Sequence, residues 1–288
     1  MFVYFVNDIH IDMHLPGIKA GKRASQVYHR WMDENLLAAD TLCIAGDIAD
    51  SSLYFLDFLA ACRDRYEHVV YIYGNHDIGI YDKEYASVSQ KIGAMNNFAD
   101  NMKRLGTSTH TIKTKFHRLD GQEIVGVNGV NFLGAMGSTD FSYGKKIGLT
   151  EEYCLSQWKE KKDGKVWKKW WTDDPYEIAK DEKSRLLAPL GSQAKDPDII
   201  LSHFAPLGVP VPDRIKNRPK SGFDYWDVSD IINMLPPGAI WHFGHTHTRL
   251  KYEKDGILYL NNPIGYPGEK TDSLGKFSKE DFLINIRK

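Results

Sequence analysis

Short polar clusters recur along this 288-residue chain, and each one directly follows a run of apolar residues. They read Asp-Ile-His at 8–10, Gly-Asp-Ile-Ala-Asp at 46–50, Gly-Asn-His-Asp at 74–77, a histidine at 203, and Gly-His-Thr-His at 244–247. The side chains that could bind a metal ion or move a proton are Asp8, His10, Asp47, Asn75, His76, His203, His245 and His247. Imidazoles mixed with carboxylates and an amide oxygen suit divalent ions such as Mn, Fe, Zn, Co or Ni. This set is too large for one ion with an open position, and it fits two ions that share a bridging carboxylate.

The doublets Asp-x-His and His-x-His add a geometric argument. In an extended backbone, alternate side chains lie on the same face, so the two members of each doublet would point to a common site. A single histidine could be an ordinary core residue, but packing gives no reason for the whole set. We also expect the glycines at 46, 74 and 244 to let the backbone turn sharply, so that the next side chain points into the site.

The apolar runs before these clusters predict the elements that position them. Strands are expected at 2–6, 41–45, 68–73, 198–201 and 239–243, helices near 24–35 and 53–62, β-structure within 111–134, and a hairpin at 249–261. Strands that alternate with helices predict a layered α/β fold. Sites in open α/β sheets gather at the carboxyl ends of strands, so the polar clusters should converge there.

The order D-x-H, G-D-x-x-D, G-N-H-D, H and G-H-x-H resembles the signature of the calcineurin-like metallophosphoesterase family, and every block is intact and in sequence. The resemblance implies an α/β sandwich of two mixed β-sheets flanked by helices. We expect a single domain over residues 1–288. A helical insertion is expected around 143–185, where Lys and Trp are frequent and no strand pattern occurs.

The resemblance also implies a role for each residue. The implied metal ligands are Asp8, His10 and His247 for a first ion, Asn75, His203 and His245 for a second, and Asp47 as the bridge between them. Metal-bound hydroxide would be the nucleophile, because cations lower the pKa of bound water. His76 would protonate the leaving oxygen or stabilise charge on it, and Asp50 would fix the tautomer of His76.

The expected reaction is therefore phosphoester hydrolysis with two divalent metal ions, Mn being favoured. The phosphoprotein phosphatase branch has Arg-Gly after the second block and Glu after G-N-H, whereas this chain has Ser51-Ser52 and Asp77. DNA-repair nuclease relatives usually add further domains. A phosphodiesterase or phosphomonoesterase acting on a nucleotide or another small phosphoester is the main expectation. A nuclease or protein phosphatase on the same core, and a non-catalytic metal-binding scaffold, are the alternatives.

Several segments keep two interpretations. Asp77 either orients a neighbour or caps the turn after it. The Trp- and Lys-rich stretch 158–171 is either an amphipathic helix that caps the core or a lid that attracts phosphorylated substrates. The loop 206–226 is either solvated or a grip for substrate phosphate. Its candidate substrate contacts are Arg214, Lys216 and Arg218. The stretch Asn-Pro-Ile-Gly-Tyr at 262–266 is expected to be a structural turn near the site.

Composition sets the remaining expectations. An apolar content of 42% and a charged content of 26% are those of an ordinary globular protein. A formal charge of −1 does not indicate a nucleic-acid-binding surface, although it leaves a local basic patch open. The three cysteines are too few for a disulfide framework or a cysteine-based zinc site. Because no apolar run approaches the roughly 20 residues of a membrane span, we expect a cytoplasmic enzyme with no membrane contact.

Overall fold

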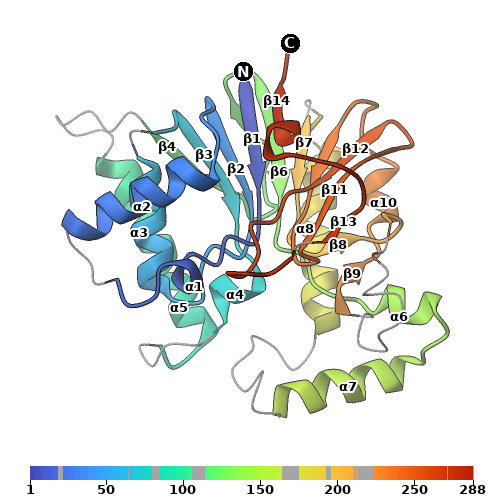
Figure 1. Cartoon of the computed structure of the whole chain (residues 1–288). Coiled ribbons are helices and arrows are strands. Elements are labelled where there is room, and N and C mark those ends of the chain that lie inside the picture. Colours follow the sequence, from blue (N-terminus) through green and yellow to red (C-terminus); the bar gives the residue numbers. More distant parts are fainter. Residues whose placement is uncertain are drawn as a thin grey trace.

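The computed structural model describes residues 1–18, 22–63, 65–79, 85–105, 114–163, 175–192, 196–210, 212, 223–270 and 272–287, and the statements that follow concern these residues. Two β-sheets stand face to face in the centre of the molecule, and helices flank them on both sides (Figure 1). No helix in these ranges is both long and apolar enough to cross a membrane.

The first sheet has five strands in the order β14-β1-β2-β3-β4. Its strands are β1 (Phe2–Val6), β2 (Thr41–Ala45), β3 (His68–Ile72), β4 (Lys115–Arg118) and β14 (Leu283–Asn285). β1 to β4 are parallel, and β14 pairs with β1 in the antiparallel direction. Every residue of β2 and β3 is buried, which explains why these strands read as continuous apolar runs rather than alternating ones.

Helices cover the outer face of this sheet, on the left of Figure 1. They are α2 (Lys22–Asn35), α3 (Ser52–Cys62) and α5 (Val88–Leu105). Two single-turn helices, α1 (Ile11–His14) and α4 (Asn75–Ile78), lie below the sheet where the loops leave its strands. The strand–helix alternation predicted from the sequence is confirmed over this half of the chain.

The second sheet has seven strands in the order β13-β11-β12-β10-β7-β6-β5. Its strands are β5 (Val125–Val127), β6 (Val130–Gly134), β7 (Ile199–Leu201), β10 (Ile240–His242), β11 (Thr248–Lys254), β12 (Ile257–Asn261) and β13 (Asp272–Ser273). β6, β7, β10 and β12 are parallel neighbours, whereas β5 and β11 each join through an antiparallel pair, so the sheet is mixed. The prediction of two mixed sheets flanked by helices is therefore confirmed.

A buried polar seam joins the two sheets beneath the strand ends. The Asn7 side chain donates to Asn261 Oδ1 at 2.7 Å, and the Asn262 backbone N–H donates to Asn7 Oδ1 at 2.8 Å. His242 Nε2 on β10 lies 3.0 Å from the carbonyl oxygen of Val6 on β1. These bonds satisfy buried polar groups of both sheets, and they fix one sheet against the other where the functional loops emerge.

The described residues of the segment expected to be a helical insertion form three helices, with a short non-helical connection at 147–150. The helices are α6 (Ser142–Lys146), α7 (Glu151–Asp163) and α8 (Pro175–Ser192). α8 ends seven residues later than the expected limit of 185 and lies near α10 (Ser229–Ile232), while α7 lies away from both sheets (Figure 1). In the described part of α7, the side chains of Cys154 and Trp158 are buried. Residues 164–174, which hold most of the stretch expected to be a cap or a lid, lie outside the described residues.

Candidate metal centre

The seven predicted metal ligands all follow strands that end at the same edge of the molecule. Asp8 and His10 follow β1, Asp47 follows β2, and Asn75 follows β3. In the second sheet, the remaining ligands are His203 after β7, and His245 and His247 after β10. The structure brings all seven side chains together, as the positions of the clusters predict.

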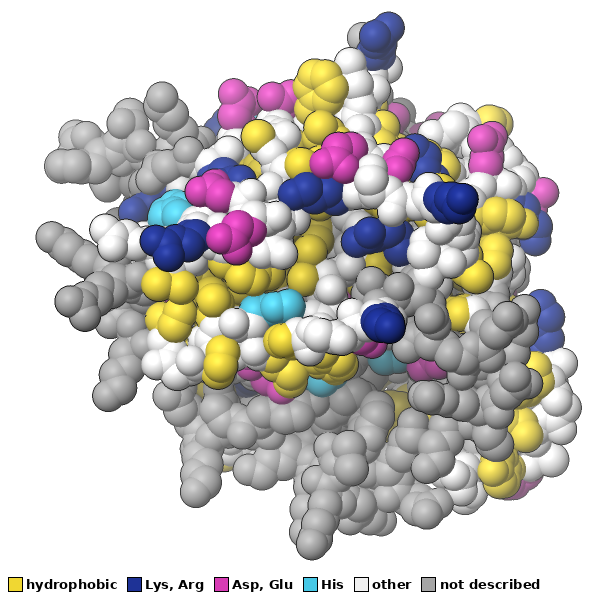
Figure 2. All heavy atoms as spheres, in the orientation of Figure 1, with side chains coloured by type: hydrophobic (Ala, Val, Ile, Leu, Met, Phe, Trp, Pro, Cys, Tyr) yellow, Lys and Arg dark blue, Asp and Glu magenta, His cyan; other side chains and the backbone are white. Residues whose placement is uncertain are grey.

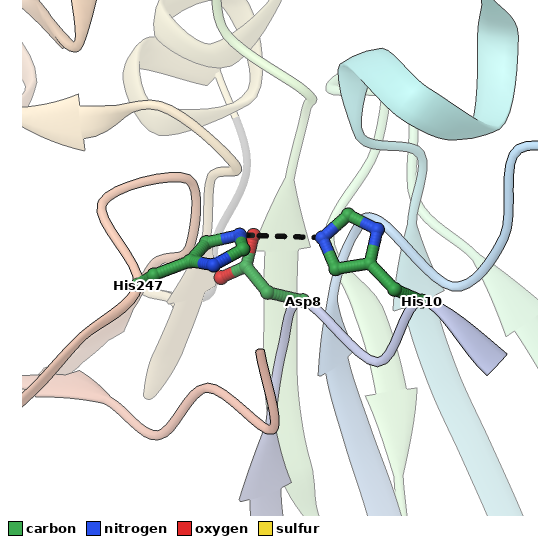
Figure 3. A group of neighbouring side chains, drawn as sticks. All are labelled: Asp8, His10 and His247. Atoms are coloured by element: carbon green, nitrogen blue, oxygen red, sulfur yellow. Dashed lines mark hydrogen bonds and ion pairs between the residues drawn. The ribbon is translucent and has the colours of Figure 1, made fainter. Parts of the chain in front are cut away.

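One group consists of Asp8, His10 and His247, which lie close enough to share an ion (Figure 3). His247 Nε2 lies 3.3 Å from Asp8 Oδ1 and 3.2 Å from His10 Nε2. In Figure 3 the two imidazoles point toward one another, with the carboxylate beside them. All three side chains are buried, so the group is largely shielded from solvent.

A second group surrounds the side-chain oxygen of Asn75. His203 Nε2 and His245 Nδ1 each lie 2.9 Å from Asn75 Oδ1. Asp47 Oδ2 is 3.1 Å from His203 Nε2 in this group and 3.9 Å from His10 Nε2 in the other. Asp47 therefore stands between the two groups.

These groups fit metal ions because several lone pairs face one another. His203 Nδ1 lies 2.8 Å from the Ala45 carbonyl oxygen, so it is the nitrogen that carries a proton and donates. Its Nε2 then faces the oxygens of Asn75 and Asp47, which are themselves acceptors. Such an arrangement is repulsive unless a proton or a metal ion occupies the middle. Nitrogen and oxygen donors together are those of Mn, Fe, Zn, Co or Ni.

The pKa shifts of the clustered side chains also indicate a site that suits a cation. Burial opposes protonation of His203, but the Asp47 carboxylate outweighs it and raises the pKa of His203 to about 9. Burial likewise opposes protonation of His247, yet Asp8 and then Glu269 raise its pKa to about 10. His203 and His247 hold the pKa of Asp47 and Asp8, respectively, well below the usual value despite burial. The same electrostatic field that favours protons on these two histidines would favour a divalent cation in their place.

The prediction that the Asp-x-His and His-x-His doublets have an extended backbone is wrong. Asp8, His10, His245 and His247 have φ angles of 50°, 44°, 68° and 46°, which is the left-handed region rather than an extended strand. With Asp47 at 55°, they make up five of the eight non-glycine residues with positive φ among those described. Such conformations cost of order 1–3 kcal/mol each and collect at functional sites. The side chains converge because tight left-handed turns aim them, and not because a strand alternates.

The glycines of the blocks are explained chiefly by close approach. A Cβ on Gly74 would lie 2.2 Å from Asp47 Oδ1, although the φ of this glycine is an ordinary −106°. A Cβ on Gly244 would lie 2.8 Å from the carbonyl oxygen of Ala45. Gly46 combines a positive φ of 81° with contacts as short as 2.7 Å. The expectation of a sharp turn therefore holds for Gly46, whereas Gly74 and Gly244 let neighbouring loops touch.

His76 and Asp50 lie next to the metal-binding groups and contact each other. His76 Nδ1 is 2.5 Å from Asp50 Oδ1, which leaves Nε2 as the outer nitrogen of the ring. Burial opposes protonation of His76, but Asp47 and Asp50 together raise its pKa above the usual value. The His76 ring lies 4.8 Å from the His10 ring. This geometry is the one that a histidine proton donor oriented by a carboxylate requires.

Of the two interpretations, the structure favours Asp77 as a residue that orients its neighbours, because the turn it caps is the one that contains it and not the one after it. Its carboxylate accepts the Gly74 N–H at 2.7 Å and so caps the single-turn helix α4. It also accepts the backbone N–H groups of residues 47, 48 and 49, at 2.9, 2.8 and 3.0 Å. One buried carboxylate therefore joins the second and third blocks through their backbones.

Two further carboxylates and a phenol, none of them among the predicted site residues, also lie near the site. Glu269 Oε2 lies 2.7 Å from His247 Nδ1, and it also accepts the Tyr266 backbone N–H at 2.9 Å. Asp224 Oδ1 lies 3.3 Å from His245 Nε2. The Tyr266 ring lies 4.4 Å from the ring of His10, and its hydroxyl is 3.4 Å from His76 Nε2. The 262–266 turn was expected near the site, and it was the only signal that could have led to Tyr266 and Glu269.

The predicted substrate contacts Arg214, Lys216 and Arg218 lie in 213–222, outside the described residues. The described ends of that loop are the short strands β8 (Ala205–Pro206) and β9 (Tyr225–Trp226), which pair in parallel.

Comparison with known proteins agrees with the geometry. A family model described as calcineurin-like phosphoesterase matches residues 1–249. An uncharacterized protein of Acanthamoeba polyphaga mimivirus is 23% identical over 279 residues, which cover 93% of this chain and 92% of that protein. The crystal structure of phosphopantetheinyl hydrolase (PptH) from Mycobacterium tuberculosis aligns with a TM-score of 0.63 at 15% identity, over 92% of this chain and 90% of that one. The chain therefore belongs to the calcineurin-like phosphoesterase family and is a metal-dependent hydrolase.

Proposed function

We propose that this protein is a dinuclear metal-dependent phosphoester hydrolase. The proposed ligands are Asp8, His10 and His247 for one ion, Asn75, His203 and His245 for the other, and Asp47 for both. The observation that carries the proposal is the place of Asp47 Oδ2, 3.1 Å from a histidine of one group and 3.9 Å from a histidine of the other. A bridging carboxylate has to stand in such a place.

The rest of the site supports hydrolysis rather than metal storage. Two bound divalent ions would supply Lewis acidity and a water molecule of lowered pKa. The chain itself supplies a proton donor: Asp50 holds Nδ1 of His76, so Nε2 is the nitrogen that can give a proton to the leaving oxygen. The Tyr266 hydroxyl, 3.4 Å from that nitrogen, can keep the ring turned toward the substrate.

The substrate we propose is a nucleotide or another small phosphoester, either a monoester or a diester. The name of the structural neighbour adds phosphopantetheinyl esters to the candidates. Ser51-Ser52 and Asp77 depart from the phosphoprotein phosphatase pattern. On the face shown in Figure 2, the described Lys and Arg side chains are interspersed with Asp and Glu and form no single basic surface. Neither feature favours a protein phosphatase or a nuclease.

A substrate panel tests this proposal. Purified protein is loaded with Mn²⁺, Ni²⁺ or Zn²⁺ in turn, with Mn²⁺ expected to be best. It is assayed on mononucleotides, cyclic nucleotides, a phosphopantetheinyl ester, a phosphopeptide and single-stranded nucleic acid. We expect turnover of at least one small ester and little of the two polymers. A metal-loaded protein that is inert toward every ester would contradict the proposal and leave the scaffold alternative.

A further inference from the structure

The two histidines of the Gly-His-Thr-His block present opposite ring nitrogens to the site. His247 turns Nε2 toward Asp8 and His10, and its Nδ1 contacts Glu269 at 2.7 Å. His245 turns Nδ1 toward Asn75 Oδ1, and its Nε2 lies 3.3 Å from Asp224 Oδ1. Each histidine therefore has a carboxylate on its outer nitrogen, although the two rings are reversed.

Asp224 reaches His245 from the segment that begins at another proposed ligand. The backbone carbonyl of Asp224 accepts the Ala205 N–H at 3.2 Å, two residues beyond His203. Phe204, from the same segment, stacks on the His245 ring with the centroids 4.3 Å apart. The face of the imidazole is therefore held by Phe204 and its edge by Asp224, which limits rotation of the ring.

The position of Asp224 depends in turn on the inserted helices. Its neighbour Phe223 is buried and packs against Phe141 and Trp158, with ring centroids 5.3 and 5.7 Å apart. Phe141 directly precedes α6, Trp158 lies on α7, and Tyr176 at the start of α8 contacts Phe141 at 5.0 Å. One aromatic cluster thus ties all three inserted helices to the residue beside Asp224.

We infer that Asp224 is a positioning residue for His245 and that the insertion holds Asp224 in place. This inference rests on the proposed function. The Asp224 carboxylate lies 3.3 Å from Nε2 of His245 and favours the tautomer with its proton on that nitrogen, so the lone pair of Nδ1 points at Asn75 Oδ1, where the second metal ion would bind. Outer carboxylates of this kind typically change metal affinity by about 10–100-fold. The insertion therefore supports one of the two metal positions.

Calorimetric metal binding tests the inference without measuring activity. Mn²⁺ is titrated into wild type, Asp224→Asn and Asp230→Asn; Asp230 is a matched control because its carboxylate pairs with Lys183 on α8 and touches no proposed ligand. We expect Asp224→Asn to weaken one of two binding events about 10–100-fold and to leave the other unchanged. Asp224→Glu, which keeps the charge, should recover part of the loss. Unchanged binding in Asp224→Asn would overturn the inference.

The same substitution in a His245→Ala background shows whether Asp224 acts through that histidine. If it does, adding Asp224→Asn to His245→Ala changes the metal affinity no further. An additional loss of the same size would contradict the inference. Phe223→Leu should weaken the same binding event by a smaller factor, and no effect would refute the part assigned to the insertion. Circular dichroism checks that each variant is folded. A wild-type protein that binds fewer than two ions would refute the proposed function instead, which separates the two failures.

Discussion

The two sheets contribute to the site in different ways. Of the seven proposed ligands, the loops after β1, β2 and β3 carry the two carboxylates, the amide and one imidazole. The backbones of the second and third loops are joined by Asp77. The loops after β7 and β10 carry three imidazoles, and each is oriented by one acceptor on its outer nitrogen. Those acceptors are the Ala45 carbonyl for His203, Asp224 for His245 and Glu269 for His247.

Because of this difference, substitutions in the two sheets should affect different quantities, the free energy of unfolding in one case and metal affinity in the other. A change at the backbone connections of the first sheet breaks several hydrogen bonds at once and should cost folding free energy. A change at a carboxylate that orients a histidine of the second sheet frees one ring and should cost metal affinity with little effect on folding. Asp47 contacts a histidine of each metal-binding group, so its substitution should have the largest effect on metal content and turnover.

Asp47→Asn should remove both metal ions and lower the turnover rate by on the order of 10³-fold or more, because the shared charge is lost. Metal content after gel filtration and the rate on the best ester measure the two effects. Asp196→Asn, an exposed carboxylate change, is the control. Full occupancy of both positions in Asp47→Asn would show that this residue is not the bridge.

His76→Ala should keep both metal ions, since His76 is assigned to proton donation. We expect rate losses of about 10²–10³-fold on esters with poor leaving groups and much smaller losses on nitrophenyl esters, which need no proton. Steady-state kinetics on the two kinds of ester measure the difference. Equal losses on both would count against His76 as the acid.

Asp77→Asn tests whether the backbone hydrogen bonds of Asp77 stabilise the loops of the first sheet. Asparagine offers one acceptor oxygen, so two of the four backbone N–H groups lose their partner in a buried place. The free energy of unfolding should fall by about 2–5 kcal/mol. Urea unfolding of the metal-free protein measures it. A loss under about 0.5 kcal/mol would mean that Asp77 does not brace the loops.

Glu269→Gln is the corresponding change in the second sheet. It should weaken one metal-binding event by about 10–100-fold, because His247 loses the carboxylate that fixes its tautomer. Its urea unfolding curve, recorded beside that of Asp77→Asn, should stay close to wild type. A large stability loss with unchanged metal affinity would reverse the roles assigned to the two sheets.

The pH dependence of metal binding tests the histidines that follow strands of the second sheet. The pKa of His203 is raised to about 9 and that of His247 to about 10, so both rings are protonated at neutral pH without metal. These protons stabilise the metal-free fold below pH 6.5, and this stabilisation is lost as the pH rises through 9 to 10. Metal must displace them, so affinity should rise about tenfold per pH unit for each displaced proton between pH 6 and 8. Calorimetry in buffers of different ionisation enthalpy counts the protons released, and affinity independent of pH would contradict the assignment.

The sequence predicted proximity best where the residues stand in contiguous blocks. The structure brings the side chains of all five blocks together, as predicted, because each block is local and each strand before it is an apolar run. The left-handed backbone at Asp8 and His245 could not be predicted, since the Asp-x-His and His-x-His spacings fit an extended chain equally well.

The missed residues have no local signature. Glu269 stands 22 residues after His247, and Asp224 stands 21 residues before His245, in a segment that the sequence marked only as a basic loop. Each reaches its histidine through tertiary packing: Asp224 through the aromatic cluster of the insertion, and Glu269 through the turn that carries Tyr266. Contacts of this kind depend on how distant segments meet, which single-chain patterns do not encode.

Titration of metal-free protein with Mn²⁺, followed by electron paramagnetic resonance, shows whether two metal ions share Asp47. We predict two ions per chain, with the six-line signal of isolated Mn²⁺ replaced by the broad spectrum of a magnetically coupled pair at saturation. In Asp47→Asn the coupled spectrum should disappear. One ion per chain, or two ions that remain magnetically independent at saturation, would show that Asp47 does not bridge a pair.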